Sequence, residues 1–153
     1  MSECNCMSTK LTFREAQLGA YNILKFIDHL CNEHGLTYFL MYGSLIGAVR
    51  DHGIIPWDDD IDVIMPRPDY DKLLKLFESS SFGYYKLFEH SLISEYPHPI
   101  ARMSDMRYKV DFDNEKDYGI GLLVDIYPLD GVGNDAKVAS ELIKESKRLS
   151  SLC

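Results

Sequence analysis

The chain has 153 residues, with 16 basic and 24 acidic side chains and a formal net charge of −8. This length favours one domain, and a composition of 46% hydrophobic and 26% charged residues argues against a disordered chain or a coiled coil. The acidic balance argues against a general nucleic-acid binder, which would carry a basic surface. We therefore expect no nucleic-acid partner.

Two of the four cysteines lie in the first six residues and a third is the last residue. They form no C-x-x-C pair and have no histidine at zinc-ligand spacing, so no structural zinc site is expected. The first ten residues lack the apolar core of a signal peptide, and no stretch is apolar enough to span a bilayer. We predict a flexible N-terminus over residues 1–11 and a cytoplasmic protein with reduced thiols.

The first predicted element is a helix over residues 12–33. Thr12 followed by Glu15 fits a capping box, and Gly35 is a plausible stop. Its apolar residues recur at three- and four-residue steps, with Gln17 among the polar residues between them: Leu18, Tyr21, Ile23, Leu24, Ile27 and Leu30. A buried strand is predicted over residues 36–42, and Ser44 can cap a short helix over residues 45–50.

The second half of the chain alternates strands and helices. A strand over residues 61–65 precedes a helix over residues 69–79, which starts next to two prolines. Further strands are predicted over residues 84–89, 100–103, 108–112 and 122–127, the last one stopped by Pro128. An amphipathic helix over residues 137–149 closes the chain. This order predicts one α+β (α/β) domain over residues 12–153, with a mixed β-sheet flanked by helices.

An acidic run, D-D-D-I-D over residues 58–62, leads into the second strand. In an extended chain Asp60 and Asp62 point the same way, while Ile61 and Val63 enter the core. Two carboxylates at 4 Å repel by roughly 4 kcal/mol for an effective dielectric near 20. Such a pair either shares a proton or binds a cation, and oxygen ligands favour Mg²⁺ or Mn²⁺ where phosphates are held.

Two other interpretations of the acidic run are open. A solvated acidic loop is common, although the apolar residues around this run argue against it. A calcium loop would use Asp58, Asp60 and Asp62 with Asp69 at the twelfth position, but Val63 stands where the sharp turn needs glycine.

Two further features support a phosphate and metal site. Gly43 and Ser44 lie between an apolar strand and a short helix, where glycine lets a phosphate approach free backbone N–H groups. Asp125 is a lone charge inside the apolar strand at residues 122–127. It is either a satisfied structural carboxylate or, alongside Asp60 and Asp62, a third acid that faces the metal.

Three motifs in the first half of the chain resemble those of a known family. Residues 42–50 read Y-G-S-L-I-G-A-V-R, residues 53–62 read G-I-I-P-W-D-D-D-I-D and residues 65–67 read M-P-R. Together they resemble the LicD family of phosphocholine and related phosphotransferases, which has the fukutin-type proteins as relatives and a nucleotidyltransferase fold. Residues 124–131 (V-D-I-Y-P-L-D-G) are similar to its second signature, and residues 102–108 to the basic strand between the two. The resemblance covers residues 13–149.

The resemblance implies an activity. A phosphocholine or similar phospho-alcohol would pass from a CDP-activated donor to a hydroxyl of a cell-surface glycan, such as lipopolysaccharide, teichoic acid or capsule. Peripheral association with membrane-linked glycan intermediates would follow. In-line attack by the glycan hydroxyl would release CMP, a reaction that needs positioning and electrostatics more than a covalent nucleophile.

The resemblance also implies roles for residues. Gly43 and Ser44 would hold the donor phosphates. The catalytic and metal-binding acids would be Asp60, Asp62 and Asp125, with Mg²⁺ or Mn²⁺ as cofactor and Asp125 as third ligand or proton acceptor.

The resemblance implies lesser roles for several further acidic and basic residues. Asp58 is a further candidate ligand, whereas Asp59 has the opposite parity and is a weaker one. Arg102 would contact substrate phosphates. Arg50 would contact substrate phosphates or pair with the acidic run, with a surface salt bridge as the alternative. Arg107 and Lys109 are weaker phosphate candidates.

Members of the family usually continue into a substantial C-terminal region, so residues 12–153 are expected to be a catalytic core without it. Two rival functions are open. One is a small nucleotidyltransferase that adds a nucleotide to a metabolite or protein and releases pyrophosphate rather than CMP. The other is a non-catalytic domain that binds a divalent ion or a partner.

Overall fold

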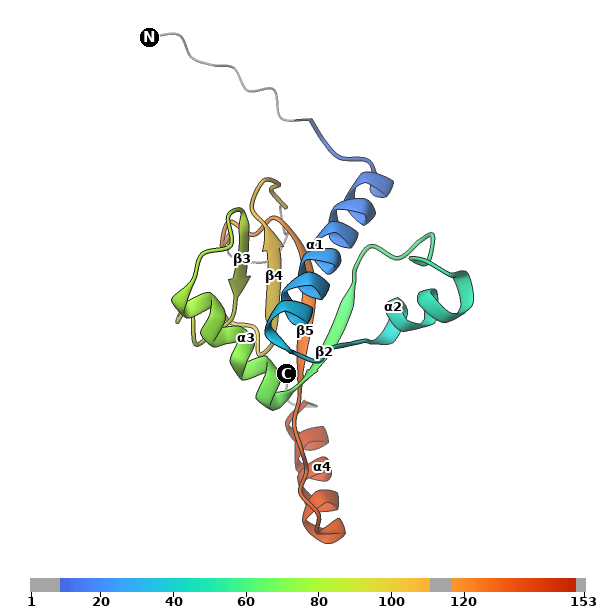
Figure 1. Cartoon of the computed structure of the whole chain (residues 1–153). Helices are drawn as coiled ribbons and strands as arrows, with labels where there is room; N and C mark the ends of the chain where they lie inside the picture. The colour runs from blue at the N-terminus through green and yellow to red at the C-terminus, as the bar shows by residue number, and fades with distance from the viewer. Residues whose placement is uncertain (1–8, 111–116, 151–153) are drawn as a thin grey trace.

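The computed structural model describes residues 9–110 and 117–150. A five-stranded sheet has the order β1-β2-β5-β4-β3 (Figure 1). Strands β2 (Asp62–Pro66) and β5 (Leu122–Leu129) are parallel neighbours. The other neighbours are antiparallel, and they involve β1 (Phe39–Leu40), β3 (Tyr85–Phe88) and β4 (Ala101–Asp105). The predicted mixed α/β sheet is confirmed. Most of the predicted flexible N-terminus, residues 1–8, lies outside the described residues.

Helix α1 (Phe13–His34) begins and ends as its sequence predicts. Thr12 and Glu15 form both hydrogen bonds of the capping box, and Gly35 closes the helix in the left-handed conformation at φ 62°. Helices α1 and α3 (Arg67–Ser79) cover the same face of the sheet (Figure 1). The core between these helices and the sheet contains alternate residues of the strands, including Val63, Met65, Met103, Val124 and Ile126.

The buried face of α1 differs from the prediction. Leu18 and Tyr21 are each 45% exposed, whereas Gln17 is only 3% exposed. Gln17 lies three residues before Ala20 and six before Ile23, so it belongs to the helical stripe that faces the sheet and the adjoining loop. Cys31, on the same helix, is a buried free thiol.

The predicted strand at residues 36–42 is reduced to the two residues of β1, because Tyr42 turns the chain with a left-handed φ of 49°. Helix α2 (Tyr42–Ile46) then starts earlier than predicted and continues into η1 (Gly47–Asp51), a π-helical turn. Ser44 is therefore inside the helix, and the prediction that it caps a helix is wrong.

The predicted strand at residues 108–112 does not form at residues 108–110, and residues 111–112 lie outside the described part. The chain turns after β4 because the Arg107 amide donates to Asp105 Oδ1. Conversely, β5 runs through Pro128. There β5 pairs only with β2, because its pairing with β4 ends at Ile126, so a residue without an N–H is tolerated.

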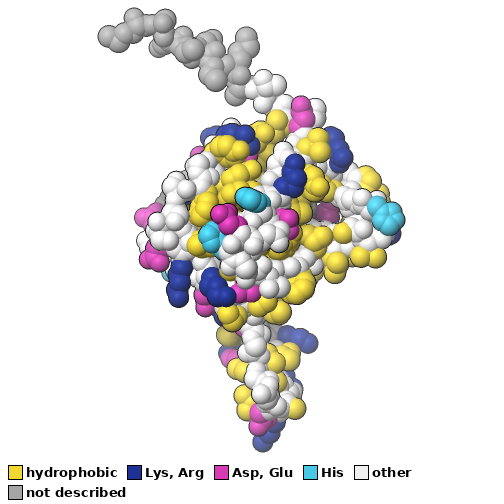
Figure 2. Space-filling view, viewed as in Figure 1, with side chains coloured by type: hydrophobic (Ala, Val, Ile, Leu, Met, Phe, Trp, Pro, Cys, Tyr) yellow, Lys and Arg dark blue, Asp and Glu magenta, His cyan; other side chains and the backbone are white. Residues whose placement is uncertain are grey.

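Helix α4 (Ala136–Ser150) projects away from the sheet (Figure 1). Its apolar side chains remain visible on the surface in Figure 2, and four of them are about half exposed: Val138, Leu142, Ile143 and Leu149. Among the described residues, no helix is both long enough and apolar enough to cross a membrane.

Candidate active site

A row of polar side chains crosses the middle of the sheet. Asp62 on β2 lies opposite Asp125 on β5, and Asp125 lies opposite Arg102 on β4. Since neighbouring residues in register project to the same side, all three side chains lie on one face. This is the face opposite the core under α1 and α3, because Val63, Met103 and Val124 point the other way.

Arg102 and Asp125 form an ion pair within this row. The Arg102 Nε donates to Asp125 Oδ1 at 3.0 Å, and the two side chains are only 15% and 16% exposed. Arg102 was predicted to contact substrate phosphates, and the structure places it against Asp125. The partly buried guanidinium offsets the negative charge of the row and orients the third acid.

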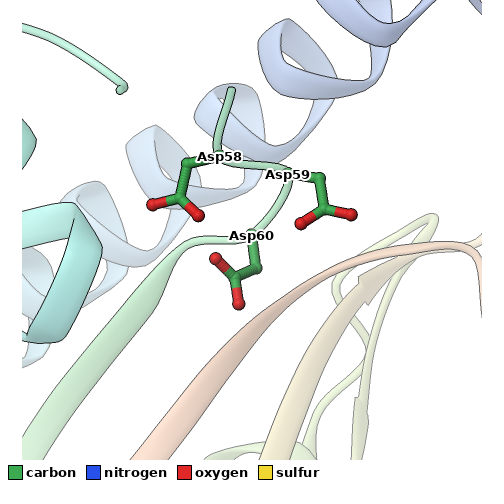
Figure 3. Close-up of side chains that lie close together, drawn as sticks. All are labelled: Asp58, Asp59 and Asp60. Atoms are coloured by element: carbon green, nitrogen blue, oxygen red, sulfur yellow. The ribbon is translucent and has the colours of Figure 1, made fainter. Parts of the chain in front are cut away.

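The other acids form a cluster in the turn before β2. Asp58, Asp59 and Asp60 each offer a carboxylate oxygen, and these oxygens lie within 4.8 Å of one another (Figure 3). In an extended chain Asp59 would point away from Asp58 and Asp60, but β2 begins only at Asp62. The turn therefore brings Asp59 close to its neighbours instead of separating it from them. We name residues 58–60 the acidic turn.

Asp60 links the acidic turn electrostatically to the row on the sheet. Burial and the charges of Asp60, Asp125 and Asp58 raise the pKa of Asp62 to about 6. Burial raises the pKa of Asp60 as well, together with the charges of Asp58, Asp59 and Asp125.

The predicted set of three metal ligands is therefore split between two places. The tight cluster contains Asp60 but not Asp62 or Asp125. The charge of Asp125 acts on Asp60, and the charge of Asp60 acts on Asp62, so the cluster and the adjacent sheet are electrostatically connected. The neighbouring carboxylates raise the pKa of Asp60 and of Asp62, and a bound cation would stabilise their ionised forms. An all-oxygen donor set fits Mg²⁺ or Mn²⁺. The residues present thus fit a divalent metal, with the acidic turn as its entry side.

Gly43 and Ser44 shape this acidic region through protein contacts. A Cβ on Gly43 would collide with the Asp58 carboxylate, so only glycine lets this carboxylate lie against α2. Ser44 Oγ accepts a hydrogen bond from the Asp62 backbone N–H at 2.9 Å. Both residues therefore position the acids that were predicted to work beside them.

The predicted phosphate-binding cations other than Arg102 have acidic partners away from the row. Arg50 pairs with Asp51 at 2.7 Å on the surface, as its alternative role anticipated. Arg107 pairs with the buried Asp105 and stacks on the Tyr84 ring at 3.7 Å. Lys109 lies 3.5 Å from the Asp117 carboxylate.

Two tyrosines that the sequence reasoning did not single out flank the acids. The rings of Tyr42 and Tyr127 meet edge to face, with their centroids 5.7 Å apart. Burial and the nearby charges of Asp62, Asp125 and Asp60 raise the pKa of Tyr127. The exposed Tyr42 also has the left-handed φ of 49°, and such strained residues concentrate at functional sites. Tyr42 lies in the Y-G-S motif and Tyr127 in the D-I-Y motif, so their positions next to the predicted site residues could have identified them from the sequence.

A pocket of about 990 Å³ adjoins the acidic turn. It lies between α1 and the chain segment from β1 to β2, and its lining includes Leu18, Tyr21, Ser44, Asp58 and Asp60. Its size is at the upper end of small-molecule sites, and its lining combines apolar walls with a few convergent polar groups. This explains why Leu18 and Tyr21 stay exposed on α1.

Comparison with known proteins agrees with this geometry. Residues 35–140 match the model of the LicD/FKTN/FKRP nucleotidyltransferase domain, which is more than half of the chain. The chain belongs to this LicD family. The matched residues contain the acidic turn, both strands of the Asp62–Asp125 row and Arg102, whereas α1 precedes them.

Individual relatives support the LicD assignment. The chain is 35% identical to the lipopolysaccharide cholinephosphotransferase LicD of Haemophilus influenzae over 141 residues, which are 92% of this chain and 52% of that protein. It is 33% identical to an uncharacterised protein of Rickettsia typhi, over 74% of this chain and 35% of that protein. The chain thus spans about half the length of the Haemophilus relative and less of the Rickettsia protein.

Proposed function

We propose that this LicD-family domain is the catalytic core of a metal-dependent transferase. It would move phosphocholine, or a similar phospho-alcohol, from a CDP-activated donor to a hydroxyl of a cell-surface glycan such as lipopolysaccharide. The 35% identity to a lipopolysaccharide cholinephosphotransferase over 92% of the chain carries this proposal. The arrangement of Asp60, Asp62 and Asp125 at one end of the β2–β5 pair supports it.

In this proposal the residues bind and orient the substrates. A divalent ion held by Asp60, Asp62 and Asp125, with Asp58 and Asp59 nearby, would neutralise charge on the donor phosphates. The glycan hydroxyl would attack the phosphorus that carries the choline and form a new P–O bond. The phosphoanhydride bond would break so that CMP leaves with the bridging oxygen, and the hydroxyl proton would pass to solvent. Asp125 is better suited to ligation than to taking the hydroxyl proton, because Arg102 stabilises its charged form.

We place the nucleotide part of the donor in the pocket between α1 and α2, which reaches Ser44 and Asp60. The choline group would then lie over Tyr42 and Tyr127, since quaternary ammonium ions favour aromatic faces near carboxylates.

The test is product analysis with CDP-choline, Mg²⁺ or Mn²⁺, and a lipopolysaccharide acceptor. Choline phosphate on the glycan and one CMP per transfer are expected, and the Asp62→Asn variant should lose at least about 100-fold in rate, in line with removal of an electrostatic catalytic group. Wild-type activity in this variant would refute the assignment of Asp62.

The family model describes a nucleotidyltransferase domain, which keeps one alternative open. Release of pyrophosphate from a nucleoside triphosphate, in place of CMP from CDP-choline, would favour nucleotide transfer. If neither Mn²⁺ nor CDP-choline stabilises the protein in a thermal-shift titration, the non-catalytic alternative is favoured.

A further inference from the structure

Gln17 connects helix α1 to the loop that carries the acidic turn. Its Nε2 donates to the backbone oxygens of Asp58 at 2.7 Å, Ile55 at 3.2 Å and Pro56 at 3.5 Å. Arg14 Nη1 donates to Gln17 Oε1 at 2.9 Å, which fixes the side of the amide that carries the N–H groups. The Gln17 side chain is only 3% exposed, and its N–H groups bond one short loop.

Apart from Gln17, this loop is held by the buried side chains of Ile55 and Ile61 and by a few backbone hydrogen bonds. Within the described residues 53–61, no helix or strand forms. The Asp58 N–H donates to the Ile55 carbonyl at 3.0 Å and closes a turn, so Gln17 and Asp58 share the same acceptor. Gln17 thereby holds both ends of the turn from Ile55 to Asp58 against α1.

The acidic turn needs such a restraint because its carboxylates repel one another. Two of them at 4 Å are unfavourable by roughly 4 kcal/mol for an effective dielectric near 20. Without a fixed backbone, Asp58, Asp59 and Asp60 would separate, and a metal would have to bring them together again. A site that is held in place beforehand avoids this loss of affinity.

We propose that Gln17 is a positioning residue for the acidic turn, an inference that rests on the proposed metal-dependent function. Gln17 lies outside the residues 35–140 that match the family model, so the site extends into α1. Its hydrogen bonds fix the main chain at Asp58, and this places the Asp58 carboxylate against Gly43 and starts the path to Asp60.

The single tryptophan of the chain provides a direct readout. Trp57 directly precedes Asp58 and is 77% exposed, so bound Mn²⁺ should quench its fluorescence. We would titrate Mn²⁺ into wild type, Gln17→Met and Asn22→Met. Methionine keeps the length of glutamine but has no N–H donor. Asn22 is on the exposed side of the same helix and controls for the added hydrophobic side chain.

Gln17→Met should weaken Mn²⁺ binding about tenfold, equivalent to ~1.4 kcal/mol, whereas Asn22→Met should stay within about twofold of wild type. Without metal, hydrogen exchange should accelerate at residues 55–60 in Gln17→Met but not in β4 or β5. Faster fluorescence depolarisation of Trp57 would support the same conclusion.

Wild-type Mn²⁺ affinity and unchanged exchange at residues 55–60 in a destabilised Gln17→Met protein would overturn the inference, because Gln17 would then serve stability alone. If Gln17→Met does not fold, Gln17→Asn keeps an amide that is one methylene too short, and the same criterion applies. If Mn²⁺ neither quenches Trp57 nor stabilises the wild type in a thermal-shift titration, the proposed metal-dependent function fails, while hydrogen exchange still decides whether Gln17 holds the turn.

Discussion

At the scale of single residues, burial and the neighbouring carboxylates make the ionised form of Asp62 unfavourable. It is 7% exposed, and its pKa is raised from 3.8 to about 6. Because the folded pKa exceeds the unfolded one, the metal-free protein loses stability as the pH rises from about 4 to about 6 and does not regain it above. The acids are therefore retained against a stability penalty, as expected for a site that serves function.

Replacing Asp62 with asparagine should remove this penalty. We expect metal-free Asp62→Asn to match wild type in stability near pH 4 and to exceed it by about 1–3 kcal/mol at pH 7.5, since one pKa unit corresponds to about 1.4 kcal/mol. Urea unfolding at the two pH values measures this. Glu78→Gln, which removes an exposed charge on α3, is the control. Equal stability of Asp62→Asn and wild type at pH 7.5 would contradict the raised pKa.

Ser44 illustrates a hydroxyl that acts on the backbone of the site. In Ser44→Ala the Asp62 N–H loses its acceptor, which should destabilise the fold by about 1–3 kcal/mol. Ser44→Thr keeps the hydroxyl and should recover most of this loss. Ser79→Ala is the control, because within the described residues the Ser79 hydroxyl donates to carbonyls of its own helix, those of Lys75 and Leu76. Thermal unfolding should rank Ser44→Ala lowest, and any other order would refute the role of this hydrogen bond.

At the scale of elements, the β4–β5 pairing determines what Arg102 does. The Arg102–Asp125 pair joins residues 23 positions apart, and it depends on the register of two antiparallel strands. Arg102→Met should leave the Asp125 charge without this cation and destabilise the fold by about 2–4 kcal/mol.

A double-mutant cycle checks this prediction. Asp125→Asn in the Arg102→Met background should cost little more, so the coupling energy should be clearly favourable. The matched exposed pair is Arg148 with Glu145, at 2.6 Å on α4, where Arg148→Met should cost less than about 1 kcal/mol. Equal effects at both arginines would show that Arg102 has no structural role beyond a surface pair.

The elements also show which parts of the molecule were predictable. Local signals placed α1, because the Thr12–Glu15 capping box and Gly35 act within one helix turn. They failed at Ser44, whose hydroxyl bonds Asp62, 18 residues away, instead of its own helix. They failed again at Gln17. Its place on the buried stripe of α1 could have been predicted from the helical spacing, but its hydrogen-bond acceptors could not, because they lie more than 35 residues further along the chain.

At the scale of the whole molecule, the sequence motifs located the site better than they assigned contacts. The acidic run and Asp125 were expected to meet, and the sheet does bring Asp62 and Asp125 into register. The split between the acidic turn and the row could not be foreseen, because it depends on where β2 begins. Likewise, the register of Asp62 with Asp125 needs a sheet order that skips from β2 to β5, and the pairing of Arg102 with Asp125 needs the register of β4 with β5.

The whole molecule also divides into a packed core and the projecting α4. Four apolar residues of α4 are about half exposed, whereas Ile23, Ile27 and Leu30 of α1 are buried in the core. Removing residues 134–153 should therefore shift the unfolding temperature of the core by less than about 2 °C, given that 1 kcal/mol moves a domain of this size by about 2–4 °C. Mn²⁺ quenching of Trp57 should be unchanged, because the acidic turn is at the other end of β2.

The control is Leu73→Ala on α3, a fully buried side chain whose truncation should cost about 2–5 kcal/mol. A fall of more than about 5 °C on removing α4, comparable to that control, would show that the helix packs against the core in solution. If the fall stays small, the apolar face of α4 is an exposed surface of this LicD-family domain. The catalytic residues would then be organised entirely by α1, α2 and the five-stranded sheet.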